Sequence, residues 1–457
     1  LDWVDITSGL NADPARTASL AASISDWPKN SATYFKGVQD KLKAFVAAGR
    51  LGPFANAYWG HPAYRLPPEA NLMATAHYLE ALEWQKDVIK VHAILGSKNP
   101  HPQTFLVGGM AIPIDPDSQN ALNADKLMEI KRLLVKAQEF VEKVYIPDLL
   151  AVASFYKDWA AIGGGVGNYL SYGEFPMDNS GSPDKLWLPP GIIMARDITK
   201  VMPVNQKSIA EYVDHSWYEY AAGAGKGLHP WEGATEERYT GPKPPYQNLD
   251  TVGKYSWVKS PRYEEQAMEV GPLAKLLVAY AKGHKQVKGA VDFVLGKLGV
   301  GPAALFSTLG RTAARGIDCL ITAQEAPKWL DQLIDNIAKG DYATHNNEKW
   351  DPSSWPAEAA GYGWHEAPRG ALGHWIKIKD QKILNYQAVV PSTWNASPRD
   401  AKGQRGPYEA ALVGTPMADP NKPLEILRTI HSFDPCLACA VHVLDARGNE
   451  MVRVKVL

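Results

Sequence analysis

Cysteine is scarce in this sequence: the 457 residues contain three, Cys319, Cys436 and Cys439. So few thiols exclude a small fold stapled by several disulfide bonds. Long apolar runs are also absent, so no segment is predicted to span a bilayer. The net charge of −1 gives no electrostatic attraction to nucleic acid or to an anionic membrane. What remains is a globular protein, and a chain of this length with 45% hydrophobic residues can bury a large core.

Amphipathic periodicity predicts a mainly helical fold. Between residues 123 and 146, apolar side chains recur at steps of three and four, and we expect that helix to end before Pro147. The stretch from Pro68 to Leu95 shows a similar pattern in good helix-forming residues. We expect further helices at 263–282, 302–325 and 327–339, the last of them closed at Gly340.

Strand signals are few. The stretches from His374 to Lys379 and from Lys382 to Val390 predict a hairpin around Asp380-Gln381, and alternating valines at 452, 454 and 456 predict one more strand. No composition break marks a domain boundary, so we expect one mainly α body with small β pieces. Three regions rich in Pro, Gly and Trp are predicted to be ordered but irregular: 176–190, 225–262 and 343–370.

The main chemical signal lies near the C-terminus, in Asp434-Pro435-Cys436-Leu437-Ala438-Cys439-Ala440-Val441-His442. Asp434 is a good helix N-cap and Pro435 suits the first helical position, which predicts Cys436 in a first turn that favours a thiolate. Cys439 follows at i+3 on nearly the same face, and His442 is one further step along. Two thiolates and an imidazole this close together suit a soft transition metal such as nickel, iron, zinc or copper.

A cysteine pair at this spacing is also typical of two other kinds of site. A thioredoxin-like redox pair normally follows a strand in a βαβ unit, and no such unit is visible in the sequence. A structural zinc site of four thiolates needs two more sulfurs, and this chain offers only Cys319. The residues alone therefore rank metal binding only slightly above two buried structural thiols. Cys319 itself is expected to lie buried on a helix as a small hydrophobe.

The longer string, Ile430-His431-Ser432-Phe433 followed by that motif, resembles the C-terminal metal-binding motif of [NiFe] hydrogenase large subunits. The membrane-associated uptake group is the part of the family that it resembles most. The resemblance runs through essentially the whole chain in co-linear blocks of Trp, Pro, Gly and His, which is far more specific than a bare cysteine pair. These blocks are 52–54 with 58–60, 66–72, 98–102, 228–231, 367–375, 390–395 and 397–400.

The resemblance implies the large-subunit fold of that family, a large helical body with a central helix bundle and small β hairpins. It also implies reversible heterolytic oxidation of H2 to protons and electrons. The implied site is a nickel and an iron held by four thiolates, with cyanide and carbon monoxide on the iron and a magnesium nearby. Cys436 would be a terminal nickel ligand, and Cys439 would bridge nickel and iron. His442 and the backbone carbonyl of Ala388 would bind the magnesium.

The same resemblance implies catalytic and lining residues. Arg369 corresponds to the arginine that lies over the two metals, a place that suits a permanently charged guanidinium, and Asp434 would hold it. Pro368, Pro391 and Ser392 would line the site around the diatomic ligands. Without the surrounding match, Arg369 would be interpreted as an ordinary surface arginine and Ser392 as a turn residue.

The resemblance further implies partners and processing. Electrons would pass to a small iron–sulfur subunit, because this chain has too few cysteines to hold clusters. A membrane cytochrome b, a maturation protease and nickel-insertion factors would be the other partners, and export with the small subunit would bring the enzyme to the periplasmic side of the cell membrane. Residues 1–442 would be the catalytic body and residues 443–457 a maturation peptide.

The family's N-terminal cysteine pair is absent from this sequence, which starts at Leu1 without an initiator Met. We therefore expect a fragment that is inactive by itself. Two functions of other classes stay open, a non-catalytic helical scaffold and a zinc-binding module with a vestigial cysteine pair. Retention of Cys436, Cys439 and His442 argues against the scaffold, since such relatives usually lose the C-terminal cysteines.

Overall fold

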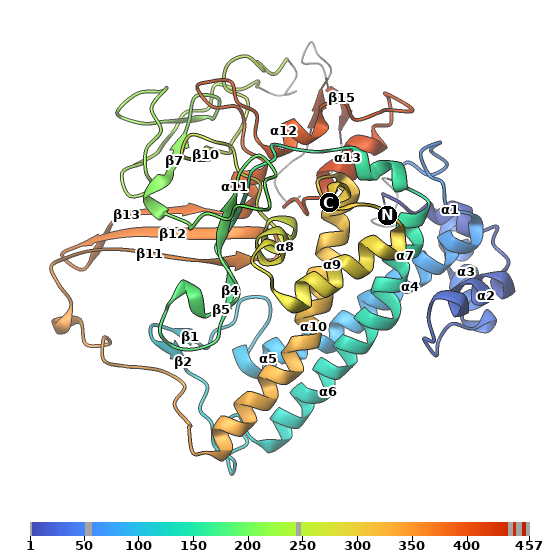
Figure 1. The fold of residues 1–457 in the computed structure, drawn as a ribbon, viewed down its shortest axis with the longest axis horizontal. Coiled ribbons are helices and arrows are strands. Elements are labelled where there is room, and N and C mark those ends of the chain that lie inside the picture. Colours follow the sequence, from blue (N-terminus) through green and yellow to red (C-terminus); the bar gives the residue numbers. More distant parts are fainter. Residues whose placement is uncertain (1, 51–56, 244–247, 437–441, 445–449, 454–457) are drawn as a thin grey trace.

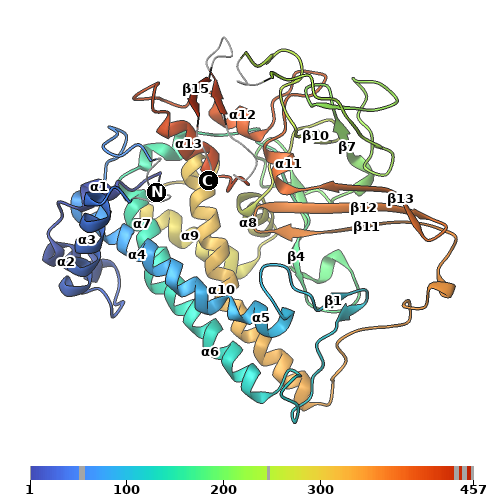
Figure 2. The same ribbon diagram turned by 180° about the vertical axis from the view of Figure 1, so that it is seen from behind.

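Long helices form the body of the molecule. The computed structural model describes residues 2–50, 57–243, 248–436, 442–444 and 450–453. Figures 1 and 2 show α4 (Pro68–Val88), α6 (Ala124–Phe140) and α10 (Thr308–Ala338) as three long inclined helices, with α6 in contact with both of the others. The prediction of a mainly helical body with a central bundle is confirmed. No helix in the described ranges is both long and apolar enough to cross a membrane.

Shorter helices surround this bundle. The first three pack on α4, and α7 to α9 pack on α10. The predicted helix from Pro68 to Leu95 is present as α4 and α5, which a break at Ile89 separates. The shorter helices are α1 (Ile6–Gly9), α2 (Pro14–Ile24), α3 (Ala32–Ala47), α5 (Lys90–Gly96), α7 (Ile146–Ser154), α8 (Pro272–Ala281), α9 (Lys285–Leu298), α11 (Pro391–Asn395), α12 (Pro407–Leu412) and α13 (Leu424–His431).

The prediction that a helix ends before Pro147 is wrong. Helix α6 continues through a π-helical turn, η2 (Val141–Tyr145), directly into α7, in which Pro147 is the second residue. Proline cannot donate to the carbonyl four residues earlier, so the Lys143 carbonyl loses its helical partner. The Ser25 hydroxyl donates to that carbonyl instead. A side chain from a distant segment therefore lets the helix pass the proline.

Two other helix boundaries also differ from the prediction. Residues 302–325 and 327–339 were predicted as separate helices, but α10 runs from Thr308 to Ala338 with Pro327 inside it. The predicted helix over 263–282 begins only at Pro272. Its first part cannot be helical because Glu264 and Glu265 have φ values of +47° and +62°, in the left-handed region.

A three-stranded antiparallel sheet lies beside α8 and α11 (Figure 1). It consists of β11 (Glu358–Ala367), β12 (Gly370–Lys379) and β13 (Lys382–Val389). The predicted hairpin around Asp380-Gln381 is β12–β13, and the positive φ values of both turn residues, +49° and +61°, fit a two-residue hairpin turn. Strand β11 was missed because most of its side chains are exposed, so no apolar alternation marks it.

The other strands form short two-stranded pairs. All three regions that were predicted to be irregular contain strands. The region 176–190 contains β5 (Leu186–Leu188), 225–262 contains β9 (Glu236–Glu237) and part of β10 (Ser260–Tyr263), and 343–370 contains β11. Val452 lies in β15, so a strand is present there, whereas residues 454 and 456 lie outside the described residues. The pairs are β1 (Phe105–Leu106) with β2 (Gly109–Met110), β3 (Tyr169–Ser171) with β6 (Gly191–Ile193), β4 (Glu174–Pro176) with β5 (Leu186–Leu188), β7 (Ile209–Tyr212) with β10 (Ser260–Tyr263), β8 (Tyr218–Glu219) with β9 (Glu236–Glu237), and β14 (His442–Leu444) with β15 (Glu450–Arg453).

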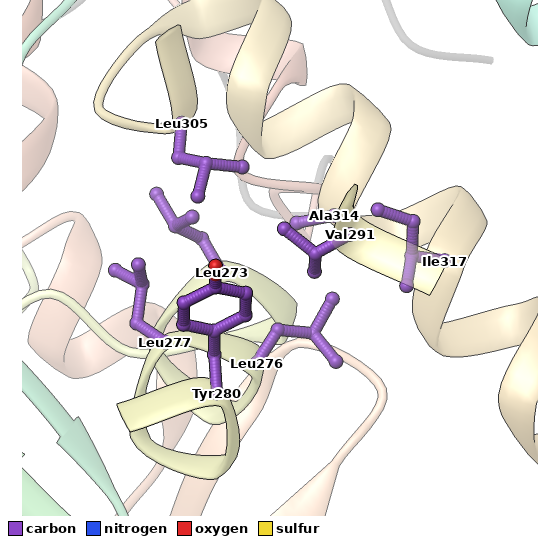
Figure 3. A pocket seen from close by; sticks show the side chains of 8 residues that line it. All are labelled: Leu273, Leu276, Leu277, Tyr280, Val291, Leu305, Ala314 and Ile317. Atoms are coloured by element: carbon purple, nitrogen blue, oxygen red, sulfur yellow. The ribbon is translucent and has the colours of Figure 1, made fainter. Parts of the chain in front are cut away.

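A small apolar cavity lies in the core between α8, α9 and α10 (Figure 3). Its volume of about 10 Å³ is close to the minimum that one water molecule needs, and aliphatic side chains dominate its lining, so we expect it to be dry. The side chains that surround it are Leu273, Leu276, Leu277, Tyr280, Val291, Leu305, Ala314 and Ile317.

Truncation of a leucine at this cavity should enlarge it and destabilise the fold. Leu277 is 2% exposed, and Leu277→Ala is expected to lower the free energy of unfolding by about 2–5 kcal/mol, measured by chemical denaturation. Leu384→Ala is the matched control, because Leu384 is 66% exposed on β13 and its loss should change stability by about 0.5 kcal/mol or less. Equal losses for the two variants would contradict the assignment of Leu277 to the core.

Candidate active site

Arg369 lies in the turn between β11 and β12. Ala367 pairs with Gly370, so Pro368 and Arg369 are the two residues of a tight hairpin turn. Gly370 has φ +126°, and a Cβ there would lie 2.4 Å from the backbone nitrogen of Gly271. Only glycine permits this close approach, in which the turn packs against the residue that precedes α8. The backbone that carries Arg369 is therefore fixed by packing on a helix of the core.

The Arg369 side chain reaches the segment that follows α13. Its Nε donates to the backbone carbonyl of Asp434 at 2.8 Å and lies 3.5 Å from the Asp434 Oδ2. The two side chains are partly open to solvent, 42% and 37% exposed. Within the described part of the chain, Nη1 and Nη2 of Arg369 have no hydrogen-bond partner. One edge of the guanidinium is thus held, while its far end makes no hydrogen bond to the described residues.

The prediction that Asp434 is the N-cap of a helix beginning at Pro435 is wrong. Its φ of +55° is left-handed, whereas an N-cap residue has an extended backbone, and residues 434–436 are not helical. Its backbone N–H donates to the carbonyl of His431, which closes the turn after α13. The predicted place of Cys439 on a helix lies outside the described residues, as do all of residues 437–441.

Cys436 follows two residues after Asp434, and its thiol is exposed and not in a disulfide. Cys439 lies outside the described residues, and His442 is described only as backbone in β14. Within the described ranges, no three His, Cys, Asp or Glu side chains are arranged to bind a metal. Cys436 nevertheless offers an exposed thiol two residues after Asp434, which Arg369 contacts. Such a thiol can serve as one ligand of a soft metal. The residues described are thus compatible with a nickel–iron group.

The predicted lining residues Pro391 and Ser392 are linked to the Arg369 turn through Asn395 and Val270. Buried Pro391 begins α11, and Ser392, partly buried, follows it. At the end of this short helix the Asn395 amide exchanges hydrogen bonds with the backbone of Val270, at 3.0 and 2.9 Å. Val270 precedes the glycine against which the Arg369 turn packs. Pro368, itself exposed, and Arg369 are thereby tied to the start of α11.

Ala388 lies on β13, opposite His374 of β12, and it is exposed. Strand β13 leads directly into Val390 and α11, so Ala388 is three residues before Pro391. The sheet therefore contributes two predicted positions, the Arg369 turn at the end of β11 and Ala388 near the end of β13. Both lie at the end of the sheet that faces α8 and α11 (Figure 1).

Sequence reasoning missed Arg315 and Tyr145. Arg315 of α10 donates from Nη1 to the carbonyl of Ser432 at 2.9 Å, and burial lowers its pKa while Asp434 raises it. Tyr145 ends the π-helical turn, and burial together with Cys319 raises its pKa to about 12. π-Helical turns are frequent at functional sites, but no sequence pattern announced this one. Arg315 is one of several charged residues of α10, so nothing in the sequence set it apart.

The structure also describes Cys319 and a glycine-rich loop. Cys319 is partly buried on α10, and burial raises the pKa of its thiol to about 11, as expected for a neutral packing residue. The glycine-rich stretch 163–168 is a loop that leads into β3 rather than into a helix. It therefore lacks the helix N-terminus on which a dinucleotide-binding loop depends.

Comparison with known proteins gives concordant similarities. The family model described as nickel-dependent hydrogenase matches residues 1–442. The uptake hydrogenase large subunit of Bradyrhizobium diazoefficiens is 53% identical over 470 residues, covering 100% of this chain and 78% of that protein. The hydrogenase-1 large chain of Escherichia coli is 47% identical, with the same two coverages of 100% and 78%. The chain thus spans about 78% of the length of these relatives.

Solved structures show the same relationship. The Ni-Fe-Se hydrogenase of D. vulgaris Hildenborough superposes with a TM-score of 0.68 at 35% identity, over 84% of this chain and 73% of that one. The [NiFeSe]-hydrogenase of Dm. baculatum gives a TM-score of 0.67 at 34% identity, over 83% and 72%.

Proposed function

Because this chain belongs to the nickel-dependent hydrogenase family, as the catalytic large subunit of a nickel–iron uptake hydrogenase, we propose that Arg369, Asp434 and Cys436 form one side of its site. The observation that carries the proposal is the contact of Arg369 with Asp434, two residues before an exposed thiol. It joins the end of the sheet to the segment after α13. The reaction is the oxidation of H2 to protons and electrons.

In this proposal the arginine acts through charge and position. The nickel–iron pair, when bound, supplies the Lewis acidity that polarises H2. Arg369 keeps a permanent positive charge at the reacting centre and presents its Nη1 and Nη2 groups to a proton acceptor. Asp434 fixes the guanidinium through two contacts, so that little reorganisation is needed during the reaction.

The ligand assignment follows the family resemblance. Cys436 would be a terminal nickel ligand and Cys439 the bridging ligand to iron, with cyanide and carbon monoxide on the iron. His442 and the Ala388 carbonyl would bind a magnesium ion. The position of Ala388 at the end of the sheet near α11 supports that assignment, since it lies on the same side as the Arg369 turn. Pro368, Pro391 and Ser392 would line the site.

A large subunit implies a small-subunit partner. We propose that this partner carries iron–sulfur clusters, and that electrons pass from it to a membrane cytochrome b on the periplasmic side of the cell membrane. A maturation protease and nickel-insertion factors would act before that. The proposed division is a catalytic body over residues 1–442 and a maturation peptide over 443–457. The end of the family match at residue 442 supports this division.

Metal analysis of the purified heterodimer tests the proposal. Nickel and iron held by the large subunit in equal amounts are expected, after subtraction of the iron in the small subunit. A zinc-binding module would contain zinc and no nickel, and a helical scaffold would contain neither. Either of those results would overturn the proposed site.

A further inference from the structure

A buried carboxyl lies directly behind the Arg369 turn. Glu366 of β11 is 4% exposed and precedes Arg369 by three residues, or about 10 Å of extended strand. Its Oε1 accepts from the Ser171 hydroxyl at 3.0 Å and from the Tyr172 backbone N–H at 2.7 Å. Its Oε2 is buried and has no partner among the described residues. An unpaired oxygen on a buried acid is costly when the acid is ionised.

Lys275 of α8 pairs with two other carboxylates and acts electrostatically on Glu366. Its ammonium lies 2.5 Å from Glu174 Oε2 on β4 and 2.9 Å from Asp318 Oδ1 on α10. Lys275 is 5% exposed, whereas Glu174 is 20% exposed and therefore reaches water. One buried ammonium thus pairs with two carboxylates and acts electrostatically on a third carboxyl, that of Glu366. Full ionisation of all three would leave an excess of negative charge in a low dielectric, so one of them is the natural holder of a proton.

Charge and burial identify Glu366 as the carboxyl that is protonated most readily. Burial raises the pKa of Glu366 to about 7, against the opposing effect of Lys275, and Glu174 raises it further. Burial lowers the pKa of Lys275, but Asp318, Glu174 and Glu366 more than offset this, so Lys275 stays charged. The phenol of Tyr172, which also faces this cluster, has a raised pKa because of burial and stays neutral.

Another buried glutamate of this chain shows what a purely structural ion pair looks like. Glu269 is 1% exposed, and both of its oxygens accept from Arg311, at 2.7 and 2.8 Å. Its charge is fully compensated, which is the usual arrangement for a buried carboxylate. Among the described residues, Glu366 has no such partner on Oε2.

We propose that Glu366 is a proton-carrying carboxyl of the hydrogenase, which takes up a proton released by H2 cleavage and passes it to solvent by way of Glu174. In the first step the Oε2 carboxylate accepts one proton through water and becomes the neutral acid. In the second step that O–H bond breaks, the proton passes to the Glu174 carboxylate, and bulk water removes it. Lys275 keeps its three N–H bonds throughout and holds Glu174 and Asp318 in place. The proposal rests on the family's reaction and not on the roles given to Arg369 and Cys436.

Infrared spectroscopy and pH profiles of the intact heterodimer test this proposal. The wild type should show a carboxylic acid C=O band that shifts in D2O and disappears as the pH rises through about 7. Glu366→Gln should lack this band and should lower kcat for H2 oxidation about 100-fold, the lower limit of the range for acid–base groups. The wild-type kcat should also fall below pH 7, because the acid is then already protonated, and the variant should lose this dependence.

Glu425→Gln is the matched control. Glu425 of α13 is 3% exposed and accepts the Ala418 backbone N–H at 2.9 Å. Its Oε2 also has no partner among the described residues, but Lys275 does not contact it. This variant should keep the band and the wild-type pH profile. Glu174→Gln should keep the band of Glu366 while slowing turnover, because it removes the acceptor next to water.

Three results would overturn the proposal. A Glu366→Gln enzyme with wild-type kcat and pH profile would show that the carboxyl carries no proton. A slow variant with an unchanged pH profile would show that Glu366 is only structural. The absence of any band assignable to Glu366 would show that it is ionised. A failure of the Arg369 or Cys436 roles would appear separately, as a change in metal content or rate with the Glu366 band intact.

Discussion

Replacement of Cys436 by serine is expected to remove nickel from the purified heterodimer and to abolish H2 oxidation. A serine hydroxyl is a hard ligand that stays protonated near neutral pH, whereas soft metals select thiolates. Loss of an outer partner of a metal ligand typically weakens metal binding by about 10- to 100-fold, so loss of the ligand itself should exceed that. Nickel per large subunit, measured by elemental analysis, should fall at least about a hundredfold.

Cys319→Ser provides the matched control, because it makes the same chemical change at another described cysteine. Cys319 is partly buried on α10, and its raised pKa of about 11 keeps it a neutral thiol. The control should retain nickel and activity, with a modest loss of stability from a polar group in an apolar site. Retention of full nickel by the Cys436 variant would refute the ligand assignment. Equal nickel loss in both variants would trace the effect to misfolding.

The helical body was predictable because its helices carry a repeating apolar face. The stripe over 123–146 identified α6, yet it could not predict continuation past Pro147. That continuation depends on Ser25, which is more than a hundred residues away and replaces the lost helical donor at the Lys143 carbonyl. Local pattern gives the existence of an element, but contacts between distant segments decide where it ends.

In the candidate site, too, the sequence identified residues but did not predict the contacts and backbone geometry that depend on tertiary packing. Family motifs led to Arg369, Asp434 and Cys436, and the structure brings the first two into contact. The same motifs gave no backbone geometry, so Asp434 was expected to cap a helix although its φ is +55°. Glu366 is invisible to sequence reasoning for a different reason. Its importance lies in an unpaired oxygen and the charge of Lys275, and both are properties of packing between segments far apart in the sequence.

Replacement of Arg369 by lysine separates charge from geometry. Lysine keeps a positive charge but lacks the planar fork, so it cannot hold the Asp434 carbonyl and carboxylate with one edge while presenting donors from the other. Loss of one oriented donor at a reacting centre typically costs about 10²- to 10³-fold in kcat. We expect a fall of that size in H2 oxidation, with nickel and iron contents unchanged, measured with an artificial electron acceptor.

Arg238→Lys is the control for this variant. Arg238 pairs with Glu219 at 3.1 Å on the surface, and the two side chains are 62% and 46% exposed. Surface pairs of this kind contribute about 0–1 kcal/mol, so the control should change neither kcat nor metal content appreciably. If Arg369→Lys kept most of the wild-type kcat, a positive charge alone would suffice and the contact with Asp434 would have no catalytic role. If instead it lost its metals, Arg369 would act in assembly of the site, because the segment before Cys436 would no longer be held in its left-handed turn.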